Sequence, residues 1–295
     1  MTLSFRYIFA LSLLTIGLAA STFAQTDKPA VAKPSPTPAP AATDKKAVKK
    51  PEPTPTPPPV TAIKGVPKLL TAEQVMESAI FLYGYPGGRA TLNQIRKTTL
   101  EKGKTTYADS DGKSEKATYQ RSVIRSETLG KEKIRLDQDF ASARYALVFV
   151  DEKIYGVYNN TVFTPREDAS KRFEDQIIHG LEPFLRYKEN ESKVEMGDRE
   201  KIMGVDYYVI AVTDKQERKT RYFVSAKSFR VMMLTYEDGG IKYKRKFYDY
   251  NYAQGTLVAF RTVLWANDKI VEESEVGTIT FGQKVDEELF KNGAS

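Results

Sequence analysis

Hydrophobic and polar residues alternate along the chain with two different periods, and each period predicts a different element. After residue 70 the spacing is helical, with Val75 and Ile80 on one face of a helix that Gly84 ends. Thr71 and Gln74 stand at the spacing of a capping box, in which each side chain satisfies a backbone donor of the other. The pattern predicts an N-terminal helix whose apolar face needs a partner surface.

Downstream of residue 91 the apolar positions recur at every second residue, which is the period of a half-buried strand. Clusters of glycine, asparagine and aspartate separate the runs and favour tight turns. Consecutive strands joined by tight turns predict an antiparallel sheet. The expected strands are 92–107, 117–127, 132–138, 144–150, 153–158 and 161–163.

Helical spacing returns over residues 164–188. Phe173, Ile177 and Leu181 form a stripe four residues apart, which predicts one buried helix face. Pro183 lacks a backbone donor and clashes with the preceding turn. We therefore expect a kinked or two-piece helix.

The last third of the chain returns to the period of strands. A long antiparallel meander with few helices favours a sheet that curls on itself, with the helices lying against one face. The pattern predicts a mainly β (α+β) fold of eleven or twelve strands. The remaining expected strands are 207–213, 221–225, 229–237, 241–252, 257–265 and 269–281.

Two of these strands are apolar on both faces, where a sheet with one face in water would alternate apolar and polar residues. Tyr208 and Ile210 alternate with other apolar side chains in "DYYVIAVTD", and Met232 and Leu234 do so in "FRVMMLTYE". The second face therefore needs a cover. A helix, another sheet and a bound apolar ligand all remain open.

An aromatic hairpin, "FYDYNYAQGTLVAFRTVLW", holds the only tryptophan of the chain. Period two predicts that Tyr248 and Tyr250 share one face, and that the next strand puts Phe260 and Trp265 on opposite faces. Tyrosine suits a boundary because its ring packs while its hydroxyl finds a polar partner. We expect one face of this hairpin to look into a concavity.

The N-terminal segment predicts export. Residues 1–24 combine Arg6, an apolar run of about 14 residues and a region of small residues that ends at Ala24, the pattern of a signal peptide cleaved after Ala24. The run is shorter than the roughly 20 residues of a spanning helix, so an uncleaved anchor is the weaker alternative. Residues 25–60 hold eleven of the fifteen prolines and predict a disordered Pro/Lys-rich linker. One domain is expected over 61–295, in a protein of the periplasm or cell envelope.

Charge and cysteine content narrow the function. The signal peptide contributes +1 and the linker +3 of the net +7, which leaves +3 on a domain of 235 residues. Such a domain lacks the strongly basic face that phosphate backbones require, so we expect no nucleic-acid partner. The absence of cysteine excludes a disulfide, a thiol nucleophile and a thiolate metal site.

Catalytic residue types are few. His179 is the only histidine, and the helical wheel puts it opposite the apolar stripe, which predicts a solvated side chain. The carboxylate clusters at 137–139, 272–275 and 286–288 have no EF-hand spacing, and "YGYPGGR" follows a helix where a phosphate loop follows a strand. We expect no enzyme, no cofactor and no metal. A hydrolase would need His179 in a cleft beside a nucleophile.

The order of elements resembles the periplasmic LolA/LolB-type carriers of outer-membrane lipoproteins over roughly residues 69–291. The resemblance implies an incomplete antiparallel β-barrel of about eleven strands, with helices covering an apolar concave face that receives acyl chains. It rests on "GGRATLNQIRKTTLEKGK", "ALVFVDEKIYGVYNN", "FEDQIIHGLEPFLRY", "IMGVDYYVIAVTD" and "YDYNYAQGTLVAFRTVLWANDKIVEESEVGTITFGQKVDEELF".

Candidate residues follow from this resemblance. The carriers have an Arg-Pro pair early in the sheet whose arginine holds a helical lid, and here "VIRSETLG" offers Arg125 without the proline. The expected ligand-binding residues are Tyr208, Ile210, Met232, Leu234, Tyr248, Tyr250, Phe260 and Trp265. The expected lid residues are Val75, Ile80, Phe173, Ile177, Leu181 and Arg125.

Two functions remain open. In the first, the half-barrel binds lipid or lipoprotein acyl chains and makes transient membrane contact. In the second, the helices fill the concavity permanently and the domain is an interaction or sensor module for an envelope protein partner. Continuous packing of the helices into the sheet, without an apolar void, would favour the second.

Overall fold

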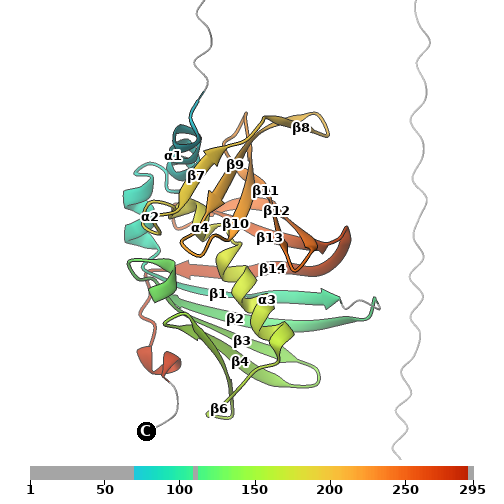
Figure 1. Cartoon of the computed structure of the whole chain (residues 1–295). Helices are drawn as coiled ribbons and strands as arrows, with labels where there is room; N and C mark the ends of the chain where they lie inside the picture. Colours follow the sequence, from blue (N-terminus) through green and yellow to red (C-terminus); the bar gives the residue numbers. More distant parts are fainter. Residues whose placement is uncertain (1–69, 109–111, 292–295) are drawn as a thin grey trace, which may run out of the picture. The chain divides into compact units, whose positions relative to one another are not determined.

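Fourteen antiparallel strands form one open sheet in the computed structural model, which describes residues 70–108 and 112–291 (Figure 1). The predicted signal peptide, the predicted linker and the first residues of the predicted domain lie outside the described residues. The first six strands are β1 (Thr98–Ala108), β2 (Ser114–Ile124), β3 (Lys133–Phe140), β4 (Arg144–Val150), β5 (Lys153–Tyr158) and β6 (Thr161–Phe163). The others are β7 (Lys193–Met196), β8 (Glu200–Ile202), β9 (Val205–Thr213), β10 (Lys219–Ser225), β11 (Val231–Asp238), β12 (Ile241–Ala253), β13 (Thr256–Ala266) and β14 (Lys269–Phe281).

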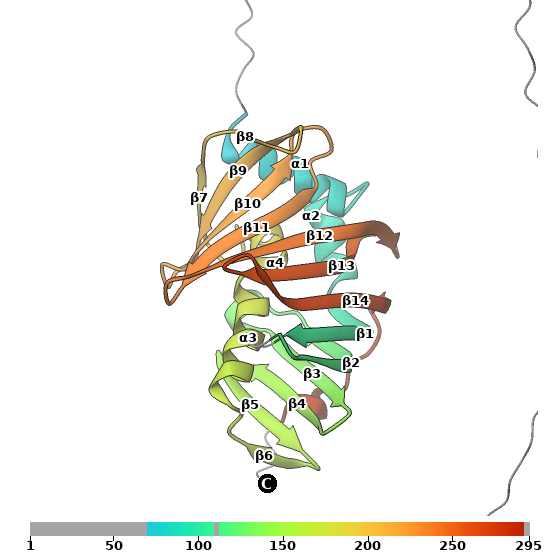
Figure 2. The same ribbon diagram turned by 90° about the vertical axis from the view of Figure 1, so that its right-hand side faces the viewer.

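The strand order explains why the sheet stays open. It runs β6-β5-β4-β3-β2-β1-β14-β13-β12-β11-β10-β9-β7, and β8 pairs with β9. The first and last long strands therefore lie side by side in the middle, while β6 and β7 form two separate edges (Figure 2). The predicted incomplete barrel is confirmed. The predicted count of about eleven is low, because β7 and β8 have only four and three residues and show no readable alternation.

Helix α1 (Ala72–Tyr83) forms where its sequence signals predict it. The Thr71 side chain accepts a hydrogen bond from the Gln74 backbone, and the Gln74 side chain accepts one from the Thr71 backbone, which completes the capping box. Val75 and Ile80 are buried on its sheet-facing side. The local capping signal was therefore a sufficient guide to this element.

Helix α2 (Arg89–Ile95) replaces the first part of the strand that was expected over 92–107. That prediction is wrong because Leu92 and Ile95, three residues apart, fit one face of a helix as well as an irregular strand. Gly88 has φ of +57° and turns the chain into the helix. The strand begins only at Thr98.

The second helical block is in two pieces, as predicted. Helix α3 (Glu167–Ile178) ends just before His179, and α4 (Glu182–Leu185) starts two residues after Gly180 with Pro183 in its first turn. Figure 1 shows α3 lying across the strands, with α4 beside the turn that joins them. A proline in a first turn loses no helical hydrogen bond, so it begins the second piece.

Both halves of the concave side are filled by helices. One core joins α1 and α4 to β9–β13, and Val75, Ile80 and Phe184 in it are 0–1% exposed. A second core joins α3 to β2–β4 through Phe173 and Ile177. Each such large side chain contributes about 1.5–3 kcal/mol by its burial. Protein therefore covers the second apolar face of the central strands.

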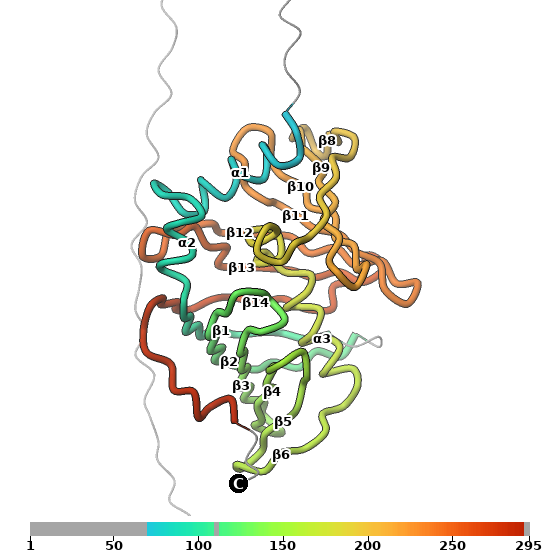
Figure 3. Tube along the Cα trace, turned by 60° about the vertical axis from the view of Figure 1, so that its left-hand side comes forward, coloured from blue at the N-terminus to red at the C-terminus, as the bar shows by residue number. Residues whose placement is uncertain are grey.

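The outer side of the sheet is covered in two places. The segment after β14, which includes the 3₁₀ turn η2 (Glu287–Phe290), runs past β1–β4 in Figure 3. Its Val285 and Phe290 pack against Val148. On β9–β11 the outer residues Val209 and Phe223 form a small cluster of their own.

His179 corrects a sequence expectation, because it is only 5% exposed. The helix ends one residue earlier, so the wheel no longer applies, and the ring turns into the sheet. It stacks on Tyr236 with centroids 3.8 Å apart, and its Nδ1 lies 2.7 Å from the Thr220 hydroxyl. Burial, and secondarily the nearby Lys171 and Arg218 charges, lower the pKa of His179 to about 3. The imidazole is therefore neutral at physiological pH.

Candidate functional site

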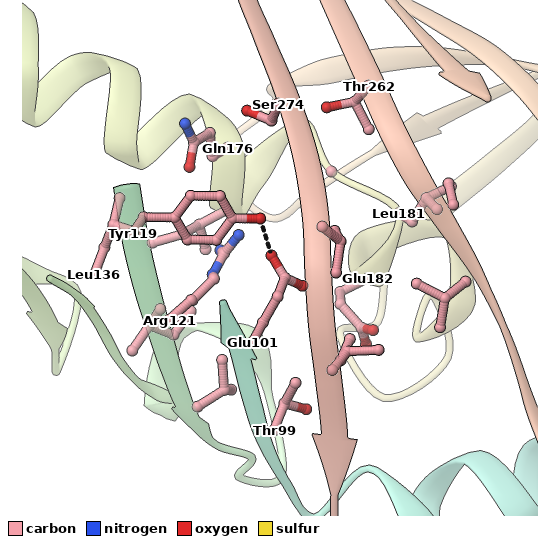
Figure 4. A pocket seen from close by; sticks show the side chains of 18 of the residues that line it. Thr99, Glu101, Tyr119, Arg121, Leu136, Gln176, Leu181, Glu182, Thr262 and Ser274 are labelled. Carbon is pink, nitrogen blue, oxygen red and sulfur yellow. Dashed lines mark hydrogen bonds between the residues drawn. The ribbon is translucent and has the colours of Figure 1, made fainter. Parts of the chain in front are cut away.

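A cavity of about 230 Å³ remains between the two cores, beneath α3 and the turn to α4. Its floor is formed by β1, β2, β13 and β14, and Figure 4 shows the side chains that point into it. Leu136, Ile177 and Leu181 supply apolar surface, whereas Glu101 and Arg121 supply charge. The cavity joins an apolar wall to a polar one, as a site for an amphiphile must.

The polar wall begins with Tyr119 on β2, whose hydroxyl donates a 2.7 Å hydrogen bond to Glu101 on β1 (Figure 4). Its ring lies over Gly103, the cross-strand partner of Tyr119. A Cβ at Gly103 would come within 2.7 Å of that ring and 2.2 Å of the Glu275 carbonyl oxygen. Only glycine at position 103 leaves room for this arrangement.

One end of the cavity is closed by Glu182 at the start of α4. Its carboxylate accepts a hydrogen bond from Arg96 at 2.8 Å and one from Arg125. Burial by itself raises the pKa of Glu182, but the guanidiniums of Arg125, Arg96 and Arg186 lower it to about 2. The sheet therefore holds α4 through a carboxylate that stays ionised.

A second ion pair lies near the same end of the cavity. Arg186, just after α4, pairs with Glu132, and both side chains are at most 4% exposed. Arg186 also donates to the carbonyl oxygens of Ser126 and Glu127. These contacts tie the end of α4 to the segment between β2 and β3.

The opposite wall is formed by Glu272 on β14, which is 2% exposed. It accepts a 3.1 Å hydrogen bond from Gln176 of α3 and lies 3.4 Å from Arg245 of β12. The sheet-facing side of α3 therefore combines a polar contact through Gln176 with apolar packing through Phe173, three residues earlier.

None of the eight expected ligand-binding residues lines this cavity. Ile210, Leu234 and, in part, Tyr208 pack in the core under α1 and α4. Tyr250 packs there too, and its hydroxyl lies 2.9 Å from that of Tyr83. Met232 stands at an irregularity of the β10–β11 pairing. Apart from Met232, these residues lie where α1 and α4 already cover the sheet.

The aromatic hairpin changes face in the middle. Asp249 has φ of +53°, so Tyr248 and Tyr250 do not share a face as predicted. Tyr248 lies under the guanidinium of Arg261, which pairs with a carboxylate on the outer side. Trp265, likewise outer, contacts Lys244 and Lys246, and Phe260 is half-buried outside the four buried clusters.

The lid candidates divide into two groups. Ile177, Leu181 and Arg125 line the cavity, whereas Val75, Ile80 and Phe173 pack in the cores on either side of it. The residues that sequence reasoning missed are the charged ones on β1, β2 and β14. Their only signal was a charged side chain at an inward position of an alternating strand. They are Glu101, Arg121 and Glu272, and Tyr119 on β2 and Glu182 on α4 were missed as well.

Comparison with solved structures identifies the fold. A LolA superfamily protein from Nitrosomonas europaea superposes with a TM-score of 0.54 at 14% identity, over 76% of this chain and 98% of the other. Two further structures are less similar. An outer membrane lipoprotein-sorting protein domain from Vibrio parahaemolyticus has a TM-score of 0.47 at 14% identity, over 74% of this chain and 97% of the other. A DUF1329 family protein from Desulfovibrio piger has a TM-score of 0.49 at 11% identity, over 76% of this chain and 98% of the other. No family model and no curated protein matches the sequence.

The chain therefore has the LolA-like fold, which the sequence predicted. At 14% identity this likeness concerns the fold alone, so ligand binding stays a prediction. Across residues 70–108 and 112–291 no cluster of three or more acidic, histidine or cysteine side chains could hold a metal ion. No helix in that part of the chain is long and apolar enough to cross a bilayer.

Proposed function

We propose that this protein is an envelope binding protein that holds an acylated, hydrophobic ligand, a lipid or a lipoprotein chain, in the cavity beneath α3. The observation that supports it is the position of this partly apolar cavity on the concave side, under a helix and a turn. The export pattern of residues 1–24 supports a periplasmic location. The LolA-like fold supports a role in outer-membrane lipoprotein sorting or lipid transport.

The size of the cavity sets what it admits while the lid is closed. A cavity of about 150 Å³ accommodates benzene, and pockets for drug-sized ligands range over about 300–1,000 Å³. About 230 Å³ therefore holds a polar headgroup and the beginning of a chain. The rest of a long acyl chain requires α3 to move.

The energetics allow that movement. Burying a chain of about 16 carbons contributes roughly 12 kcal/mol at about 0.8 kcal/mol per methylene. Displacing Phe173 and Ile177 from their core costs about 1.5–3 kcal/mol each. The chain would replace these two side chains against β2–β4. The half under α1 is a poorer route, because its core is the larger of the two and opening it would displace more buried side chains.

Arg125 acts as the latch of this lid in our proposal. It lies after β2 and pairs with Glu182, so it connects the sheet to the first residue of α4. Arg96 reinforces the same carboxylate. Breaking these pairs would release the turn between α3 and α4 and open the cavity at Leu181.

One observation favours the second function, an interaction module that binds no lipid. The helices α1 and α4 pack into their half of the concavity through Val75, Ile80 and Phe184, each at most 1% exposed. A module of this kind would keep α3 closed under all conditions. The two functions therefore differ in whether an amphiphile enters beneath α3.

Mass spectrometry of organic extracts from the natively exported protein, together with displacement of a fluorescent fatty acid, tests the proposal. Leu181→Trp should lower the affinity for the fluorophore at least tenfold, because it fills the cavity. Leu82→Trp is the matched control, since Leu82 is a half-buried leucine of α1 outside the cavity. A protein that carries no lipid and binds no fluorophore would overturn carriage in favour of the module.

A further inference from the structure

Charged groups in the cavity are paired, with two exceptions. Arg96 and Arg125 share Glu182, and Arg245 lies against Glu272. Glu132, also in the lining, pairs with Arg186. Among the described residues that line the cavity, the charges left without an ionic partner within 4.0 Å are one guanidinium, Arg121, and one carboxylate, Glu101.

These two residues are direct cross-strand partners. Glu101 on β1 stands opposite Arg121 on β2 in the antiparallel register, and both line the cavity. Opposite charges in such positions have Cβ atoms about 4.5–5.5 Å apart and ordinarily pair. Here they do not, because the carboxylate of Glu101 accepts its hydrogen bond from Tyr119.

The separation is built into the sheet. Tyr119 reaches Glu101 because Gly103 leaves space for its ring. The hydroxyl therefore draws the carboxylate away from Arg121 and leaves each charge open to the cavity. Half-buried charges without partners are unfavourable unless something else compensates them.

We propose that the cavity recognises a zwitterionic headgroup of an amphiphile, whose phosphate or carboxylate binds Arg121 and whose ammonium group binds Glu101. A purely anionic headgroup would leave Glu101 uncompensated, and a cationic one would leave Arg121 uncompensated. The chain then points toward Leu136 and Ile177.

This inference rests on the proposed function, so the experiment separates the two. Competition with a fluorescent fatty acid is measured for three single-chain lipids with the same acyl chain. Lysophosphatidylethanolamine is zwitterionic, lysophosphatidylglycerol is anionic, and a monoacylglycerol is uncharged. The wild type should bind the zwitterion at least tenfold more tightly than the other two.

Variants assign the two charges. Glu101→Gln should abolish the preference over the anionic lipid, and Arg121→Gln should reduce binding of both phosphate-bearing lipids to the level of the monoacylglycerol. Arg261→Gln and Glu273→Gln remove a matched ion pair on the outer side and should leave the preferences unchanged. Unchanged thermal unfolding shows that the variants fold. The wild-type preference remains decisive if a variant does not.

Each result distinguishes the headgroup inference from the proposed function. Equal affinity of the wild type for all three lipids overturns the headgroup inference and leaves the proposed function intact. No binding of any lipid overturns both. Free phosphoethanolamine that competes as well as the lysolipid overturns acyl-chain binding and leaves the charge pair as a site for a small zwitterion.

Discussion

Glu182 meets the guanidiniums of both Arg96 and Arg125, and so one carboxylate joins α4 to two other segments of the chain. His179, three residues earlier, is fixed by Thr220 and Tyr236 of the sheet. Individual polar side chains therefore position the turn between α3 and α4. Each of these contacts requires one protonation state, an ionised carboxylate at Glu182 and a neutral imidazole at His179.

The pH dependence of stability should reveal His179. Its pKa is about 3 in the folded state and near 6.5 in the unfolded chain, so the unfolded state binds the proton first. The stabilisation from the neutral imidazole is complete above pH 6.5 and decreases as pH falls toward 3. At pH 5 the loss is about 2 kcal/mol.

Urea unfolding of the wild type and His179→Gln at pH 7 and pH 5 measures this effect. The wild type should lose about 2 kcal/mol more than the variant between the two pH values. Other titrating groups are common to both proteins and cancel in the difference. Parallel pH profiles would contradict the buried, neutral imidazole.

Helix α3 is attached to the sheet in two different ways. Phe173 and Ile177 pack into the core over β2–β4, and Gln176, next to Phe173 on the helix surface, contacts Glu272. Apolar packing is non-directional, whereas polar contacts depend on geometry. Glu182, the proposed latch, stands at the start of α4 shortly after α3 ends, so changes there should affect the proposed lid as an element.

Arg125→Gln should loosen the lid. Loss of one of two guanidiniums at Glu182 weakens the hold on α4, so amide hydrogens of residues 177–186 should exchange at least tenfold faster. The effect should be smaller in α1, which shares its core with α4 but also packs on β13 and other strands. Hydrogen exchange with mass spectrometry makes the comparison.

Arg135→Gln serves as the control for this measurement. Arg135 pairs with Asp137 within β3 and donates a hydrogen bond to the carbonyl oxygen of Leu289 in η2. Its replacement should leave exchange at residues 177–186 as in the wild type. Equal exchange in the Arg125 variant and the wild type would remove Arg125 from the role of a latch.

At the scale of the whole domain, the pairing of β1 with β14 is the contact that assembles the cavity floor. It joins strands from the two ends of the domain and places Thr105 within 3.0 Å of Ser274. The cavity floor is formed by residues on both sides of this seam. The site therefore exists only when the complete sheet has formed.

A truncation tests the predicted domain boundary. Residues 25–60 have no aromatic residue or leucine with which to build a core. A protein of residues 61–295 should therefore unfold at the same temperature, within about 1 °C, as one of residues 25–295. Differential scanning calorimetry measures both, and a loss of several degrees would show that the segment stabilises the domain.

The sequence by itself determined the elements with strong local signals. The capping box of Thr71 and Gln74 predicted the start of α1, and Pro183 predicted the break between α3 and α4. Alternation with tight turns predicted the antiparallel sheet, and the order of elements predicted the LolA-like fold. These features depend on residues close together in the chain.

Only the tertiary structure decided which side chains meet in the cavity. A positive φ at Asp249 separates Tyr248 from Tyr250, and the end of α3 turns His179 inward. Neither change alters the period of the sequence around it. The wall of Glu101 and Arg121 depends on the pairing of β1 with β2 and on the space at Gly103. The register of two strands and the close approach of their side chains depend on how the strands pair, so the pattern along one strand cannot predict them.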